Sequence, residues 1–142
     1  MTDKPSWLFK QSGVIPYRRS GDSIEILIIT SRKRKRWVIP KGVIEPGLTP
    51  IQSAAAEAFE EAGLRGNIDP KAVGEYDYNK WGGTCHVRVF LMEVIDVLDT
   101  WPEDSIRSRR WTTVDEAAAS VRENALKAMI LDVPSYICND IS

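Results

Sequence analysis

Three glutamates, Glu57, Glu60 and Glu61, stand at the spacing i, i+3 and i+4 near the end of residues 42–64, GVIEPGLTPIQSAAAEAFEEAGL. On an α-helix these positions share one face, with Cβ atoms about 5–6 Å apart. Because like charges this close repel one another, we expect a cation between them, and a hard divalent ion with oxygen ligands fits best. The glycines and the preceding PKG motif indicate a loop–helix unit that holds phosphate beside the metal.

The plainest alternative is a solvated helix face, since exposed glutamates are common. The neighbouring sequence argues against it. Among the neighbouring positions one turn away from the glutamates only Arg65 is a base, so little local charge relieves their repulsion. Lys41 and the glycines of the preceding loop also favour a phosphate and metal site.

The helix that carries the glutamates has clear ends in the sequence. Thr49 is a good N-cap, Pro50 suits the first helical position, and Gln52 completes a capping box. Gly63 suits the left-handed residue that ends a helix. Alanines form much of the apolar side, which predicts that the helix lies close against a sheet.

Apolar and alternating runs predict strands on both sides of this helix. Gly82-Gly83 indicates the turn of a β-hairpin. The expected strands cover residues 12–19, 24–30, 37–40, 73–81, 84–95 and 110–112.

Two more helices are expected near the end of the chain. Thr113 and Glu116 form a second capping box that opens a helix through about Val121. Helical spacing resumes at Leu126, and we expect Pro134 to stop that helix. Since strands and helices alternate irregularly, the fold class is α/β, with a mixed sheet that has helices on both faces.

Composition sets the broad class. The chain has 142 residues, which predicts one domain over residues 1–142, and its net charge of −1 gives no reason to expect nucleic acid or an anionic membrane as partner. Cys85 and Cys138 are expected to be reduced, mostly buried thiols. The N-terminus shows no apolar signal segment, and no apolar run reaches the roughly 18 residues of a membrane span, so a cytoplasmic protein is expected.

The stretch 42–64 resembles the Nudix box, which runs Gly, five residues, Glu, seven residues, Arg-Glu-aliphatic-x-Glu-Glu-x-Gly-aliphatic. Trp37-x-x-Pro40-Lys41-Gly42 also looks like family members. Two positions depart from the pattern, because Leu48 replaces the first Glu and Ala56 replaces the Arg. In the family this Glu and this Arg are thought to pair with each other or to orient the metal-binding glutamates. The loss of both is therefore less damaging than the loss of one, since no charged partner is left unpaired. The residues in register are Gly42, Glu57, Glu60, Glu61, Gly63 and Leu64.

The resemblance implies a Nudix-like α/β/α sandwich that hydrolyses a nucleoside diphosphate linked to another group, or a related phosphoanhydride. It implies Mg²⁺ or Mn²⁺ as cofactor, held by Glu57, Glu61 and the backbone carbonyl of Lys41. Glu60 is then a further ligand or the base that orients water. The base varies across the family, so Glu57 and Glu60 are both catalytic candidates.

Five consecutive basic residues, 32–36, lie just before the acidic helix. They suit a nuclear localisation or nucleic-acid patch, a solvated loop, or a cradle for an extended polyphosphate. We favour the cradle, because the run lies between a strand and the metal loop and can focus its charge there. The candidate substrate-binding residues are Lys41, Arg18, Arg32, Arg34, Arg36 and Arg88.

The segment WPEDSIRSRRW, residues 101–111, with a short helix after it resembles the diphosphoinositol polyphosphate and diadenosine polyphosphate phosphohydrolases. This likeness implies small-molecule substrates with many phosphates, whether an inositol pyrophosphate, a dinucleoside polyphosphate or inorganic polyphosphate. Glu103 and Asp104 stand where many Nudix enzymes place an extra carboxylate. Two other functions stay open: an RNA 5′ pyrophosphohydrolase, and a regulatory Nudix domain that binds a nucleotide without catalysis. Exposed tryptophans would permit a homodimer.

Overall fold

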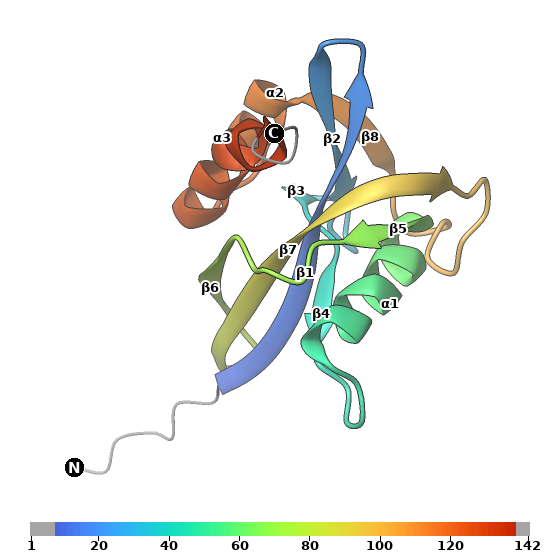
Figure 1. Cartoon of the computed structure of the whole chain (residues 1–142). Helices are drawn as coiled ribbons and strands as arrows, with labels where there is room; N and C mark the ends of the chain where they lie inside the picture. The colour runs from blue at the N-terminus through green and yellow to red at the C-terminus, as the bar shows by residue number, and fades with distance from the viewer. Residues whose placement is uncertain (1–7, 139–142) are drawn as a thin grey trace.

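The computed structural model describes residues 8–138, and within them the chain forms eight strands and three helices (Figure 1). Their order along the chain is β1 (Leu8–Ser20), β2 (Ser23–Thr30), β3 (Trp37–Val38), β4 (Lys41–Val43), α1 (Pro50–Ala62), β5 (Leu64–Ile68), β6 (Gly74–Lys80), β7 (Gly83–Val97), β8 (Arg109–Thr113), α2 (Val114–Ser120) and α3 (Asn124–Cys138).

One mixed sheet joins all the strands, with β1 and β7 side by side at its centre. These two strands run parallel, in a register that extends from Leu8 opposite Thr84 to Tyr17 opposite Glu93. The other pairings are antiparallel: β2 and β4 on β1, β5 and β6 on β7, and β3 and β8 on β2. A parallel pair needs a long connection, and here everything between β1 and β7 supplies it.

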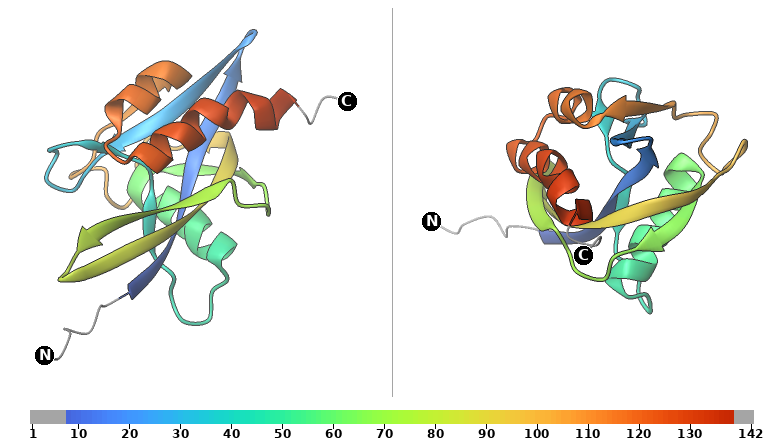
Figure 2. Two further views of the ribbon diagram at one scale, coloured as in Figure 1. Left: turned by 90° about the vertical axis from the view of Figure 1, so that its left-hand side faces the viewer. Right: turned by 45° about the horizontal axis from the view of Figure 1, so that its top comes forward.

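Helices cover both faces of the sheet, as Figures 1 and 2 show. On one face, Ala54, Ala58 and Ala62 of α1 pack in a buried cluster with residues such as Val14. On the other face, α2 and α3 pack in a second cluster that includes Ile15. Because successive strand residues point to opposite faces, a continuous apolar run serves both layers. The α/β sandwich with a mixed sheet is therefore confirmed.

The predicted caps are present. The Thr49 side chain accepts from the Gln52 amide, the Gln52 side chain returns the bond, and Gly63 ends α1 with φ 66° and ψ 37°. Thr113 and Glu116 form the same reciprocal pair before α2. The β6–β7 hairpin also forms, although its turn residues are Trp81 and Gly82, both with positive φ, rather than Gly82-Gly83.

The expected stop at Pro134 is wrong, because α3 continues through it to Cys138. A proline inside a helix forfeits one backbone hydrogen bond. Here Ile130, Val133 and Ile137 on the same helix are all buried in the core, so tertiary packing holds the last turn. Burial of that face outweighs the local signal.

Two short strands were not predicted, β4 and β5. β4 follows Pro40 directly and pairs with Gln11–Gly13 of β1, while β5 begins at once after the Gly63 cap. Within residues 8–138, no helix is long and apolar enough to cross a bilayer. Cys85 is a buried free thiol as expected, whereas the Cys138 side chain and residues 1–7 of the N-terminal segment lie outside the described part.

Candidate active site

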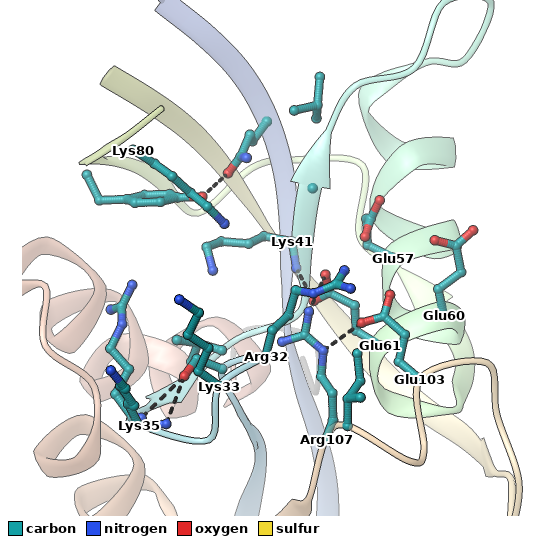
Figure 3. A pocket seen from close by; sticks show the side chains of 18 of the residues that line it. Arg32, Lys33, Lys35, Lys41, Glu57, Glu60, Glu61, Lys80, Glu103 and Arg107 are labelled. Atoms are coloured by element: carbon teal, nitrogen blue, oxygen red, sulfur yellow. Dashed lines mark hydrogen bonds and ion pairs between the residues drawn. The ribbon is translucent and has the colours of Figure 1, made fainter. Parts of the chain in front are cut away.

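A pocket of about 920 Å³ opens where α1, β4 and the β6–β7 hairpin tip meet the loop that carries the basic run, residues 32–36, called the basic loop below (Figure 3). Its two sides carry opposite charge. The acidic side consists of Glu57, Glu60, Glu61 and Glu103. The basic side consists of Arg32, Lys33, Lys35, Arg36, Lys41, Lys80 and Arg122. The predicted glutamates and most of the predicted basic run therefore face one shared space.

Glu61 is the most enclosed member of the acidic side, with only 8% of its surface exposed. The backbone amide of Lys41 donates to its Oε1 at 3.1 Å, and the guanidinium of Arg107 lies 3.2 Å from its Oε2. Burial raises the pKa of this carboxyl, while Arg107 and Lys41 act in the opposite direction. These contacts fix the orientation of the carboxylate beside the start of β4.

Glu57 lies against Gly42, the first glycine of the predicted motif. A Cβ atom at Gly42 would overlap the Glu57 carboxyl group, so this position has room only for glycine while Glu57 keeps its place. Burial first, and then the charges of Glu61 and Glu60, raise the pKa of Glu57 to about 8. A nearby cation would favour the charged form of Glu57 and lower its pKa again.

The donor chemistry fits a hard divalent cation, since it consists of crowded carboxylate oxygens next to a backbone strand. Figure 3 shows Glu57, Glu61 and Glu103 on the side of α1 that faces Lys41, with Glu60 at its outer edge. Within the described residues, no three His, Cys, Asp or Glu side chains already converge in a metal-binding arrangement. Glu57 and Glu61 are therefore the two side chains best placed to hold a metal, and Glu60 would have to turn inward to join them.

Arg107 was not predicted as a site residue. It is buried and makes three contacts, from Nε to Glu103 at 2.9 Å, from Nη1 to the Thr30 carbonyl at 3.1 Å, and from Nη2 to Glu61 at 3.2 Å. The spacing of Glu103 and Arg107 at i and i+4 was the one sequence signal that could have indicated it. The long reach from the segment before β8 to α1 is not visible in the sequence.

Three predicted substrate-binding arginines do not line the pocket. Arg18 pairs with Glu25 and stacks on Trp111, near the opposite end of β1 from the pocket. Strand alternation separates the second, Arg88, from the pocket. Tyr78, which lines the pocket, pairs with Cys85 of β7, so the side chain of Cys85 is on the pocket face of the sheet. Arg88 is three positions further along β7, and strand alternation therefore places it on the other face.

Arg34 is the third, although it belongs to the basic run. Its backbone is left-handed, with φ 54°, which turns its side chain toward the carbonyl of Ser105 and the hydroxyl of Ser108. Arg36 does line the pocket and also bonds Glu123 at 3.0 Å. The run is therefore a bent loop in which some bases point to the pocket and Arg34 points away.

The NUDIX domain model matches residues 9–132 of the chain. The chain belongs to the Nudix hydrolase family. Its members generally use divalent metals.

Several proteins with similar sequences align with most of this Nudix chain. Nudix hydrolase 16, mitochondrial, of Arabidopsis thaliana is 33% identical over 138 residues, 85% of this chain and 77% of that protein. Diphosphoinositol polyphosphate phosphohydrolase 3-beta of Bos taurus is 30% identical over 119 residues, 82% of this chain and 71% of that protein. A crystal structure of a C. elegans Ap4A hydrolase binary complex shares the fold, with a TM-score of 0.80 and 21% identity. The match covers 92% of this chain and 98% of that chain.

The two residues that depart from the Nudix box, Leu48 and Ala56, lie in the loop before α1 and on α1 itself. Leu48 is partly exposed in the loop before α1, and Ala56 is half-buried on the helix. Neither residue lines the pocket. The helix caps and the alanine face, which do not depend on these two positions, hold α1 where it delivers Glu57 and Glu61.

We expect the metal-free Nudix protein to lose stability as the pH rises from about 5 to about 8. The pKa of Glu57 is raised from 4.5 to about 8, so between these values the folded state keeps a proton that the unfolded state has released. This contribution is complete below pH 4.5 and is lost as the pH passes 8. Thermal unfolding in EDTA at several pH values measures the slope. Glu57→Gln should flatten it, and an unchanged slope in that variant would contradict the assignment.

Proposed function

We propose that the chain is a divalent-metal-dependent hydrolase of phosphoanhydride bonds in nucleoside-diphosphate-linked or polyphosphate substrates, of the dinucleoside polyphosphate or diphosphoinositol polyphosphate type. The observation that carries this proposal is a pocket with glutamates on one side and a row of basic side chains on the other. Cleavage of an anhydride between phosphates requires mainly positioning and charge neutralisation, and the two sides of the pocket are suited to these tasks. Small-molecule substrates agree with the names of the relatives.

In this proposal Glu57, Glu61 and the Lys41 carbonyl would hold the metal ion. A bound Mg²⁺ or Mn²⁺ supplies charge neutralisation at the phosphate oxygens. Glu60, at the outer edge of the helix, is a further ligand or orients the attacking water, and Glu57 is the alternative base. Arg107 remains the ion-pair partner of Glu61 when the metal is bound.

The basic side of the pocket would hold the phosphates that are not attacked. Lys41 is the best single candidate, because it lines the pocket and flanks the acidic side directly. Burial lowers the pKa of Lys41 to about 8. A phosphate anion beside the amine would favour its charged form, so binding and protonation support each other.

A substrate panel tests the function directly. Substrate loss and product formation are followed by anion-exchange chromatography with diadenosine tetraphosphate, an inositol pyrophosphate, inorganic polyphosphate and 5′-triphosphorylated RNA, each with Mg²⁺, with Mn²⁺ and with EDTA. We expect turnover of one or more of the first three, and none in EDTA. Turnover of the RNA alone, or binding with no turnover of anything, would overturn the proposal and favour one of the two alternatives.

Substitutions in the basic loop should raise KM with little change in kcat. For the triple variant Arg32→Gln/Lys33→Gln/Lys35→Gln we expect an increase of about tenfold, from three exposed charge contacts of roughly 0.5 kcal/mol each. The increase should be larger for substrates with more phosphates. Arg34→Asn is the matched control, because Arg34 belongs to the same loop but points away from the pocket. Equal effects on short and long substrates would contradict the cradle.

A further inference from the structure

Helix α1 delivers several glutamates to the pocket but no cation of its own. Its last turn contains no basic residue, and Ala56 stands where the Nudix box has arginine. Glu61 is nevertheless buried at 8% exposure. A buried carboxylate of this kind requires a partner that is both charged and hydrogen-bonded.

Arg107 provides that partner from a different part of the chain. It lies in the segment before β8, and its guanidinium joins Glu61, Glu103 and the Thr30 carbonyl. Its side chain is only 6% exposed, and the planar fork fixes direction as well as charge. Because Thr30 is also bonded to Ser108 through both backbone and side chain, the arginine is anchored to a rigid corner of the sheet.

We propose that Arg107 is a positioning residue that replaces, from outside the helix, the cation missing at position 56. It holds Glu61 by Oε2, while the Lys41 amide holds Oε1, so that the carboxylate keeps one orientation toward the metal position. This inference rests on the proposed metal-dependent function. It goes beyond it by assigning the orientation of Glu61 to an arginine outside the Nudix box.

The competing role for a pocket arginine is direct contact with a substrate phosphate. Three directions of the Arg107 fork are already occupied by protein oxygens, and the side chain is buried. The two roles differ in the substrate-free protein. A positioning residue affects metal affinity without substrate, whereas a phosphate contact affects KM alone.

The experiment measures Mn²⁺ binding by electron paramagnetic resonance in the substrate-free protein. For Arg107→Gln we expect a loss of about 10–100-fold in Mn²⁺ affinity, the usual effect of removing a group that orients a metal ligand. Arg107→Lys keeps the positive charge but not the planar guanidinium group, so its Mn²⁺ affinity should lie between those of the unaltered protein and Arg107→Gln. Arg110→Gln is the matched control, since Arg110 belongs to the neighbouring strand, stacks on Trp37, and does not line the pocket.

A second variant guards against misfolding. Arg107→Gln alone leaves Glu61 and Glu103 without their partner, so Glu103→Gln/Arg107→Gln is also made, in which one of the two carboxylates is neutral. Near-ultraviolet circular dichroism checks the fold of each variant, and at least the double variant should fold and bind Mn²⁺ less tightly than Glu103→Gln alone.

Two outcomes are distinguishable. If the unaltered protein fails to bind Mn²⁺, the metal assignment is overturned, and the role of Arg107 falls with it. If the unaltered protein binds Mn²⁺ and a folded Arg107→Gln or double variant binds it equally well, with any defect confined to KM, the positioning role alone is overturned. Full recovery by Arg107→Lys would contradict the importance of the fork.

Discussion

Replacement of Glu61 by glutamine is expected to lower metal-dependent turnover by about 10³-fold, since a catalytic metal contributes several kcal/mol and each 1.36 kcal/mol is a factor of ten. The substitution keeps the shape of the side chain and an oxygen for the Lys41 amide, which donates to it at 3.1 Å. It removes the charge of the most enclosed carboxylate in the pocket. Arg107 retains Glu103 as a charged partner at 2.9 Å, so we expect the fold to survive.

Product formation at saturating Mg²⁺ or Mn²⁺, followed by anion-exchange chromatography, together with thermal unfolding, measures both parts of this prediction. Glu93→Gln is the matched control, because it makes the same chemical change on β7, outside the pocket. Normal activity in a folded Glu61→Gln protein would refute the assignment of the acidic side as the metal site.

The second large effect is expected at Gly42, where alanine should lower turnover by roughly 10²-fold, the cost of about 1 Å of misplacement at a catalytic group. The added methyl group would overlap the Glu57 carboxyl, which is the flexible end of a side chain and can move away. The fold should therefore survive while Glu57 leaves its position. Steady-state kinetics and circular dichroism separate the two effects.

Gly21→Ala is the control for a glycine substitution. Gly21 lies in the turn between β1 and β2 with φ 61°, and an added Cβ there would meet nothing within 4 Å. We expect it to reduce stability through backbone strain but to leave kcat unchanged. A Gly42→Ala protein with normal kcat would show that the Glu57 position is not needed for turnover.

The elements that the sequence predicts well are those with local signals. The N-cap at Thr49 and the C-cap at Gly63 fix α1 to the residue, because each depends on a few neighbouring hydrogen bonds. The glutamate spacing is likewise a local property of one helix. The strands were found from apolar and alternating runs, apart from β4 and β5, which are only three and five residues long.

What the sequence does not contain is the pairing of distant strands. The parallel contact of β1 with β7 places Gln11 near Tyr78, and their side chains share a 2.8 Å hydrogen bond in the pocket. Neither residue carries a signal for this. Arg107 was missed for the same reason, since its partner Glu61 lies on a different element. Arg34 was misplaced because a left-handed backbone at a residue other than glycine is uncommon.

The closing turn of α1 has a consequence for protein engineering. Its carbonyls at Glu60, Glu61 and Ala62 accept bonds from the Glu103 amide, the Trp101 indole and the Arg109 guanidinium, respectively. Gly63 ends the helix, but these last three carbonyls depend on residues 101–109 for their hydrogen bonds. A chimaera that received residues 42–64 alone would inherit orphaned carbonyls and a loosened glutamate cluster. A functional graft would have to transfer residues 98–109 as well, as the second half of a bipartite cassette.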